Sequence, residues 1–451
     1  MTRNVLLIAL GSTARADCLA EAISRCKNTA LFSYLSHANP SVIARSKNHV
    51  VGRANDLEAI QRFAREVTPD LAVISPEAPL AAGVVDALNE VGVPCAGPLK
   101  TNARLESSKS FMRNLLKKYD IEGSLEYHVF DSMDGVEDYL IDLGKFVVKP
   151  DGLTGGKGVK VLGDHLKGVE DAKTYCQQLL DQGSKVVLEE KLEGEEFSVQ
   201  FFTDGKTVIP SPIAQDHKRA FEDDTGPNTG GMGSYSMQNH LLPFVSASDL
   251  ETAKRITQEV AEAIFKETGI RFKGIMYGGF MLTVEGVKLI EYNVRFGDPE
   301  VMNILPLIKS DFVEVMDAIV HERLRDVKLE FAQKATVCKY AVPEGYPLKP
   351  KKGEIIDISS LRAYENELGG KLKVYLGSVE SLDGSDALQL RMGASRAIAC
   401  VGIADKLEDA ERIAEEAVRR IKGPVTHRKD IGTTALVQKR VNHMNALRHE
   451  K

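Results

Sequence analysis

The sequence predicts an α/β protein of about three domains. Two observations predict this. The 451 residues are roughly three times the ~150 residues of a typical domain. Continuous apolar runs also alternate with helical stretches, as in parallel sheets whose faces are covered by helices. Apolar residues make up 43% and charged residues 27%, which is ordinary for a globular chain and excludes a fibrous repeat or a disordered tail.

The first hundred residues carry the strongest alternation. Val5 to Leu10 is an uninterrupted apolar run and predicts a buried strand, followed by a helix from Ala14 to Ile23. Leu71 to Ile74 repeats the pattern before a second helix around Ala82 to Val91. This order predicts a βαβ arrangement with a parallel sheet.

Two loops follow these strands, at 11–15 and 75–80. Ligands of parallel sheets bind beyond the carboxyl ends of the strands, so both loops are candidate substrate loops. Ordinary connecting loops are the alternative.

The middle of the chain reads as short strands around a glycine-rich connection. A helix is predicted over 249–268, with Ser248 and Glu251 as a capping box and Gly269 as its stop. The predicted strands cover 146–149, 159–162, 185–189 and 195–202.

Beyond residue 330 the pattern is again strand-rich. It then predicts an amphipathic helix from Leu407 to Ile421, capped by Asp405 with Glu408. The last segment, 434–451, predicts a basic helix. We expect its charged face to be solvated rather than to bind nucleic acid.

Charge and cysteine usage limit the partners. The net charge is −6, from 58 basic and 64 acidic residues, so we expect no nucleic acid partner. No apolar run approaches the ~20 residues of a membrane helix, so we expect no membrane partner. The six cysteines are scattered without a Cys-x-x-Cys pair, which predicts reduced thiols in a cytoplasmic protein.

The segment from Lys149 to Gly158 is the first chemical signal. It places four glycines within seven residues, and Lys149 and Lys157 bracket most of them. Glycine lets backbone N–H groups approach a ligand closely, and the lysines add point charges, so the pattern suits a polyphosphate. No Ser or Thr follows Lys157, which excludes a Walker A loop. A hairpin that acts as a mobile lid fits better; a merely flexible hairpin is the alternative.

The acidic segment from Glu189 to Glu196 is the second signal. Two carboxylates seven positions apart can bracket a nucleoside, Glu189 at the adenine amino group and Glu196 at the ribose hydroxyls. Backbone groups of Lys191 and Leu192 would read the edge of the ring. A solvated acidic turn would give the same pattern.

The third signal is Glu291, Asn293 and Arg295, at the end of a predicted strand. Alternate residues of a strand share one face. A carboxylate and an amide oxygen suit Mg²⁺, and Arg295 beside them suits a transferring phosphoryl group. A structural ion pair would explain Glu291 and Arg295 but not Asn293.

The fourth signal is the stretch from Gln215 to Arg219 with the backbone-rich loop from Asp224 to Gly233. Asp216 can bind an amine, and Lys218 or Arg219 a carboxylate or phosphate. The sequence shows no nucleophile elbow and no His-Glu-x-x-His motif, which favours phosphoryl activation over a side-chain nucleophile.

These four segments, in this order, resemble the ATP-grasp superfamily and, within it, the family of phosphoribosylamine–glycine ligases (glycinamide ribonucleotide synthetases). Pro76 to Gly83 and Glu106 to Lys109 also match, so the resemblance covers about residues 70–320. Gln215 to Lys218 and Gly226 to Gly233 are its most family-specific stretches.

The resemblance implies an α/β fold in three parts. An ATP-grasp domain at 106–330, with a hairpin lid at about 125–195, would follow a Rossmann-like N-terminal domain at 1–105. A small α/β C-terminal domain would occupy 331–451.

The resemblance also implies a reaction. ATP, with Mg²⁺ or Mn²⁺, would phosphorylate glycine, and the amine of 5-phosphoribosylamine would attack the acyl phosphate. The products would be glycinamide ribonucleotide, ADP and phosphate, in de novo purine biosynthesis. A monomer or homodimer is expected.

Residue roles carry over in the same way. Arg295 would be catalytic, and Glu291 and Asn293 would bind the metal. ATP would be bound by Lys109, Lys149, Gly155, Gly156, Lys157, Glu189, Lys191, Leu192 and Glu196. The substrates would be bound by Gly11, Arg15, Glu77, Asp216, His217, Lys218, Asn228, Thr229 and Gly230.

The chain departs from the family pattern at three places. Residues 11–18 read Gly-Ser-Thr-Ala-Arg-Ala-Asp-Cys where the family usually has Gly-Ser-Gly-Gly-Arg-Glu-His-Ala. Ser75 replaces a usual Gly, and Gly278-Gly279 offers no further metal ligand. The alternatives are an ATP-grasp carboxylate–amine ligase with a different amine, and a catalytically silent ATP-binding regulator.

Overall fold

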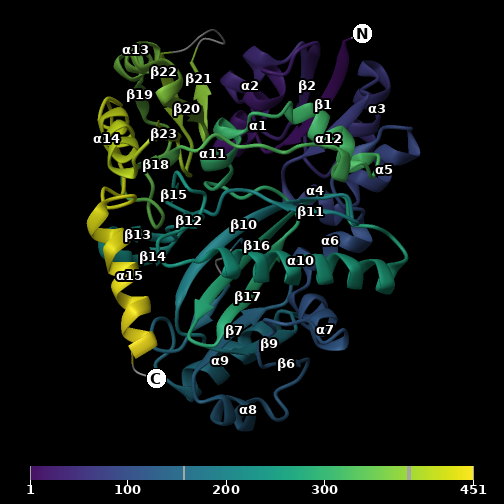
Figure 1. The fold of residues 1–451 in the computed structure, drawn as a ribbon, viewed down its shortest axis with the longest axis vertical. Helices are drawn as coiled ribbons and strands as arrows, with labels where there is room; N and C mark the ends of the chain where they lie inside the picture. The colour runs from purple at the N-terminus through teal and green to yellow at the C-terminus, as the bar shows by residue number, and fades with distance from the viewer. Residues whose placement is uncertain (1, 156–157, 383–387, 450–451) are drawn as a thin grey trace.

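The computed structural model describes residues 2–155, 158–382 and 388–449. In Figure 1 the purple N-terminal part and the green-to-yellow C-terminal part lie next to each other at the top, and the middle of the chain extends below them. None of the helices in these ranges combines the length and apolar character needed to cross a bilayer.

The N-terminal part is a parallel five-stranded sheet in the order β3-β2-β1-β4-β5, which confirms the predicted βαβ arrangement. Neighbouring β1 and β4 direct the two candidate substrate loops to the same sheet edge. The strands are β1 (Arg3–Ala9), β2 (Thr29–Leu35), β3 (Asn48–Val51), β4 (Leu71–Ile74) and β5 (Cys95–Ala96).

The helices of this part are α1 (Ala14–Ser24), α2 (Pro40–Arg45), α3 (Leu57–Val67), α4 (Glu77–Ala82) and α5 (Val84–Glu90). The helix predicted around 82–91 corresponds to α5, whereas α4 occupies most of segment 75–80, which was predicted as a loop. Gly83, with φ of 97°, separates the two helices because its left-handed backbone ends α4.

A lower lobe follows α6 (Lys100–Ser107) and α7 (Lys109–Lys118). Its antiparallel sheet has the order β6-β9-β7-β8, and Val147 pairs with Val161, as the predicted hairpin requires. The lobe has its own apolar core and lies at the bottom of Figure 1. Its elements are β6 (Tyr127–Phe130), α8 (Val136–Leu143), β7 (Phe146–Pro150), β8 (Lys160–Val161), α9 (Val169–Asp181) and β9 (Val186–Glu190).

The central sheet is antiparallel, in the order β11-β10-β16-β17, and α10 packs against it. Its strands are β10 (Glu195–Thr203), β11 (Val208–Pro210), β16 (Gly274–Thr283) and β17 (Gly286–Asn293).

Helix α10 (Ala247–Thr268) ends at Gly269, as predicted, with φ of 71°. Its capping box was predicted wrongly. Ser246 is the last extended residue and accepts from the backbone of Asp249, whereas Ser248 already lies in the first turn.

The C-terminal sheet takes strands from two regions of the chain. Its order β12-β15-β18-β23-β20 joins β12 (Gln215–Asp216) and β15 (Gly233–Ser236) to strands beyond residue 334. The later elements are β18 (Ala335–Pro343), β19 (Ile355–Asp357), α13 (Ser359–Leu368), β20 (Leu372–Leu376), β21 (Val379–Ser381), β22 (Gln389–Met392), β23 (Ile398–Ala404), α14 (Leu407–Val418), β24 (Val425–Thr426) and α15 (Thr434–His449).

The predicted cap of α14 is also wrong. Lys406 occupies the N-cap without a side-chain bond, and Asp405 pairs with Lys334 instead. The remaining elements are β13 (Arg219–Phe221), η1 (Glu222–Asp224), β14 (Thr225–Asn228), α11 (Val301–Ile304), η2 (Leu305–Leu307), α12 (Phe312–Val320), η3 (Leu324–Asp326) and η4 (Gly369–Lys371). All six cysteines are free, which agrees with the predicted reduced thiols.

Candidate active site

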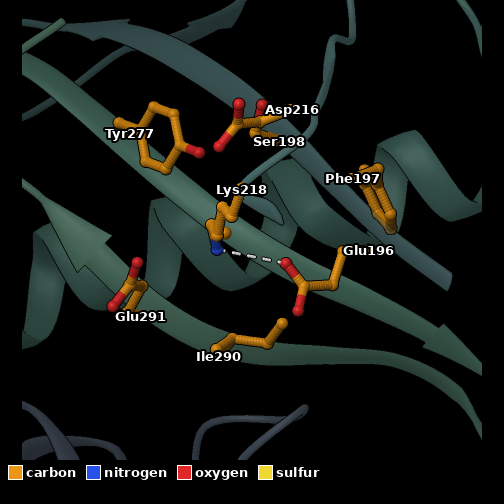
Figure 2. Close-up of a pocket in the computed structure, with 9 residues that line it drawn as sticks. Glu196, Phe197, Ser198, Asp216, Lys218, Tyr277, Ile290 and Glu291 are labelled. Carbon is orange, nitrogen blue, oxygen red and sulfur yellow. Dashed lines mark hydrogen bonds and ion pairs between the residues drawn. The ribbon is translucent and has the colours of Figure 1, made fainter. Parts of the chain in front are cut away.

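A pocket opens between the central sheet and the β12–β13 segment (Figure 2). Three of the four sequence segments with chemical signals contribute to it. Its lining residues are Glu196, Phe197 and Ser198 on β10, Asp216 on β12, Lys218 after it, Tyr277 and Gly279 on β16, and Ile290 and Glu291 on β17.

Lys218 stands between two carboxylates of this pocket. Its Nζ lies 3.1 Å from Oε2 of Glu196, and Figure 2 shows Glu291 on its other side. Glu196 raises the pKa of Lys218, and Glu291 and Asp216 add to the effect. Lys218 therefore stays protonated and can bind a carboxylate or a phosphate.

Glu291 and Asn293 lie on β17 as predicted. Burial alone would raise the pKa of Glu291, but Lys218, Lys149 and Lys109 outweigh it and lower the pKa. The amide oxygen of Asn293 accepts a hydrogen bond from Arg295 at 2.6 Å. Gly279 pairs with Glu291 across the sheet and has no side chain to add.

This donor set fits a hard cation that shares its shell with phosphates. The described ranges contain no group of three or more His, Cys, Asp or Glu side chains that could enclose a metal. One carboxylate and one amide oxygen are what Mg²⁺ uses when waters and substrate phosphates complete its shell.

Arg295 joins the central sheet to the N-terminal loops. Its guanidinium lies 3.2 Å from Glu106 and 3.4 Å from Glu77, and Arg15 approaches Glu77 at 3.5 Å. Burial opposes ionisation of Glu77, but Arg295 and Arg15 prevail and lower its pKa to about 2. Burial would lower the pKa of Arg295, but Glu106 and Glu77 raise it. Arg15 also donates to the carbonyl of Phe296 at 2.8 Å.

Glu189 is placed differently from its predicted contact with adenine. Its side chain is 2% exposed, and Arg113 binds both of its oxygens, at 2.8 and 2.9 Å. Lys149 lies 2.7 Å from the same carboxylate. The physical reason is that residue 189 faces α7, where Arg113 is fully buried. Arg113 had no recognisable signal in the sequence beyond its charge, and Glu106 was noted only as part of a family-like stretch, without a role.

The other predicted ATP-binding residues lie in the lower lobe or next to it. Lys109 donates to the carbonyl of Gly152 at 2.7 Å, and burial lowers its pKa. Lys191 donates to the carbonyl of Leu162 at 2.9 Å. Gly155 lies in a turn with φ of 58°, and Leu192 is half-buried after β9. Gly156 and Lys157 lie outside the described residues.

Asp216 forms the polar end of the pocket with Tyr277. Burial raises the pKa of Asp216, and the nearby Glu300 raises it further. Tyr277 donates to Glu300 at 2.7 Å. A Cβ on Gly231 would approach Asp216 to 2.6 Å, so glycine is required for this close approach.

His217 does not line the pocket, contrary to its predicted role. Its side chain is buried beside Tyr235, with ring centroids 5.9 Å apart. Residues 216 and 217 point to opposite sides of the extended backbone. Burial, with Arg428 next, lowers the pKa of His217 to about 3, so it is neutral at neutral pH.

The remaining substrate candidates act through the backbone. Thr229 holds the Lys218 carbonyl with its hydroxyl, at 2.9 Å, and Arg396 binds the Gly230 carbonyl, at 2.7 Å. Asn228 ends β14 opposite Arg219. The Gly11 carbonyl accepts from Asn39 at 2.9 Å, and a Cβ on Gly11 would clash with the His37 carbonyl.

Comparisons with known proteins agree with this architecture. Three models of the phosphoribosylglycinamide synthetase family match, the N domain over residues 3–106, the ATP-grasp (A) domain over 107–301 and the C domain over 336–434.

Similar relatives cover nearly the full chain. Phosphoribosylamine–glycine ligase of Methanocaldococcus jannaschii is 48% identical over 450 residues, which are 98% of this chain and 99% of the relative. The enzyme of the same name from Methanosarcina barkeri is 44% identical over 443 residues, again 98% and 99%. The crystal structure of Thermotoga maritima phosphoribosylamine–glycine ligase superposes with a TM-score of 0.77 at 26% identity, covering 95% of this chain and 100% of that one.

Proposed function

The chain belongs to the phosphoribosylglycinamide synthetase family, and we propose from this premise that its pocket joins glycine to 5-phosphoribosylamine. It is an ATP-dependent ligase of purine biosynthesis. The products are glycinamide ribonucleotide, ADP and phosphate. The observation that carries the assignment is the meeting of Glu196, Lys218 and Glu291 in one pocket.

ATP lies between the lower lobe and the central sheet in this proposal. Lys149 and Lys109 contact its phosphates, and the glycine-rich loop from Gly152 to Gly158 supplies backbone donors. Glu196 accepts from the ribose hydroxyls, and the backbone at Lys191 and Leu192 meets the adenine edge. Glu189 does not contact ATP in this proposal. It positions Lys149, whose Nζ lies 2.7 Å from its carboxylate.

Glu291 and Asn293 are proposed to hold the divalent metal, Mg²⁺ or Mn²⁺, together with the phosphates. The metal neutralises charge on the phosphates when it is bound. The amide oxygen of Asn293 accepts from Arg295 at 2.6 Å and has a second lone pair with which it would bind the metal.

Arg295 stabilises the acyl phosphate. The guanidinium stays charged because Glu106 and Glu77 raise its pKa. In the described part of the chain, Nε of Arg15 is buried without a hydrogen-bond acceptor. An unpaired buried donor is costly, so this atom suits an anionic oxygen of a substrate. Asp216 holds the amine of glycine, and Lys218 its carboxylate.

The altered loop at 11–18 does not favour a different amine. Asp17 and Cys18, which stand where the family has His and Ala, are both fully buried. Asp17 pairs with Arg45 and accepts from the backbone of Leu376. These departures therefore face the N-terminal core and the C-terminal sheet, while Arg15 keeps its place beside Glu77.

We further propose the division into residues 1–105, 106–330 with a lid at about 125–195, and 331–451. The enzyme acts in the cytoplasm as a monomer or homodimer on small-molecule substrates. Support comes from the separate apolar core of the lower lobe and from the buried free cysteines.

The test is ADP release with Mg·ATP and glycine, with and without 5-phosphoribosylamine generated in situ. Release should need both substrates, and mass spectrometry should detect the amide. Turnover with another amine would move the assignment to a different carboxylate–amine ligase. ATP binding without any turnover would mean a regulator.

A further inference from the structure

The C-terminal helix α15 begins at Thr434, where the match to the family's C domain ends. Figure 1 shows this yellow helix running down the side of the molecule beside β13 and β14. Leu436, Val437 and Met444 are buried and attach it. The face predicted to be solvated is only partly so, because Lys439, Arg440 and Arg448 contact residues of the central part.

Arg440 is the main contact of this helix. Its Nε lies 3.4 Å from Oε2 of Glu195, and its Nη2 binds the carboxylate of Asp224. His443 approaches Glu195 as well, at 2.7 Å. Glu195 is 5% exposed, so its carboxylate depends on these partners.

The two carboxylates that Arg440 bridges are next to the pocket along the chain. Glu195 directly precedes Glu196, and Asp224 ends η1, at the turn of the β13–β14 hairpin that starts beside Lys218. Across the pocket, Glu196 and Lys218 contact each other at 3.1 Å. These contacts form a closed ring. It runs from Arg440 to Glu195, along the chain to Glu196, across to Lys218, and through the β13–β14 hairpin to Asp224, which contacts Arg440.

Asp224, on the hairpin side of the ring, has a second partner. Arg428 lies 2.8 Å from Asp224 and donates to the Arg219 carbonyl at 3.2 Å. Glu195 has no such second anchor outside α15 among its ion pairs in the described residues. Arg440 thus ties the start of β10 to the hairpin through ion pairs with Glu195 and Asp224.

We propose that Arg440 is a positioning residue that sets the separation of Glu196 and Lys218 and thereby the affinity for ATP. The inference rests on the proposed function, in which Glu196 binds the ribose. Both pocket side chains are about half exposed and long, so their own packing does not fix them. Their geometry must come from the backbone behind them, which Arg440 holds.

The test compares Arg440→Ala and Arg440→Lys with the wild type. Arg440→Ala should raise KM for ATP roughly tenfold, because a small displacement of binding groups weakens their contacts, with kcat nearly unchanged. Arg440→Lys should recover part of the loss. Gln438→Ala is the matched control, since Gln438 is exposed on the same helix and its side chain donates to Asn442 of that helix.

A double-mutant cycle with Glu196→Gln separates positioning from general stability. If Arg440 acts through Glu196, the two effects on KM for ATP should be clearly less than additive. Additive effects, or a rise in KM for glycine with KM for ATP unchanged, would overturn the inference. If Arg440→Ala fails to fold, Asp224→Asn loosens the same ring from the hairpin side and should raise KM for ATP several-fold.

The two proposals fail in different ways. A wild-type enzyme that neither binds nor turns over ATP would overturn the proposed function and this inference with it. Normal wild-type turnover with an unchanged KM for ATP in the folded Arg440 variants would overturn the inference alone.

Discussion

Lys149 and Glu189 form a buried ion pair, with 2.7 Å between Nζ and Oε2. The sequence suggested two separate ligands of ATP, a lysine at the phosphates and a glutamate at the adenine. In the structure Glu189 instead joins Lys149 to Arg113 in one buried cluster. The glutamate therefore sets where the lysine points.

Glu189→Gln should destabilise the fold by roughly 3–5 kcal/mol, because it leaves the buried charge of Arg113 without its partner. Burial opposes ionisation of Glu189, but Arg113 and Lys149 lower its pKa to about 2. Its stabilising effect is thus complete above pH ~5 and is lost as the pH falls towards 2.

Urea unfolding at pH 7 and pH 4 measures both effects. The wild type should lose about 1 kcal/mol between these pH values that the variant does not lose. Glu193→Gln, at an exposed position near the same strand, is the control and should follow the wild type. Equal pH dependence of the wild type and Glu189→Gln would contradict the assigned role.

Lys149→Ala should weaken ATP binding by about tenfold or more, since a desolvated charged contact to phosphate is lost. Isothermal titration with ATP measures the change. Lys145→Ala removes a lysine from the same region, but its side chain is 72% exposed, so ATP binding should stay as in the wild type.

Arg295→Ala should lower kcat by about 10²- to 10³-fold while ATP affinity changes little, because the guanidinium acts on charge that develops in the reaction. Arg295→Lys keeps the charge but not the planar fork that spans Glu77 and Glu106, and should recover only part of the rate. Steady-state kinetics and a separate ATP titration give both quantities. An unchanged kcat would exclude Arg295 from catalysis.

His217→Gln should leave the KM for glycine near its wild-type value, because the ring faces away from the pocket. Burial lowers the pKa of His217 to about 3. The unfolded chain binds a proton below pH ~6.5, so the native state loses about 2 kcal/mol of stability between pH 6.5 and 5. The variant should lack this loss, which thermal unfolding across that range would show.

Hydrophobic periodicity predicted the elements well. β4 matches its predicted residues, and β1, β7 and β9 each lie within two residues of theirs, because uninterrupted apolar runs fix buried strands. The caps at Ser246 and Lys406 were missed because several polar residues at each helix start satisfy the same sequence pattern. Which of them is the last extended residue depends on the backbone.

The sequence predicted correctly those neighbours within the candidate site that come from one short segment of the chain. Glu291 and Asn293 lie together because alternate residues of β17 share a face, and Arg295, in the bend just after the strand, donates to Asn293. The position of Glu189 depends on Arg113 of α7, 76 residues earlier. The surroundings of His217 include Arg428, more than 200 residues later. No spacing within one motif carries that information.

The sheet that joins β12 and β15 to β18 also affects how the chain matures during synthesis. When a ribosome has made residues 1–330, β15 still lacks its neighbour β18, although every pocket residue has been translated. The sheet that positions Asp216 and Lys218 is therefore complete only after β18 and β23 have been synthesised. Arg440 comes later still, so under our proposal the nucleotide site is complete only after helix α15 has been made.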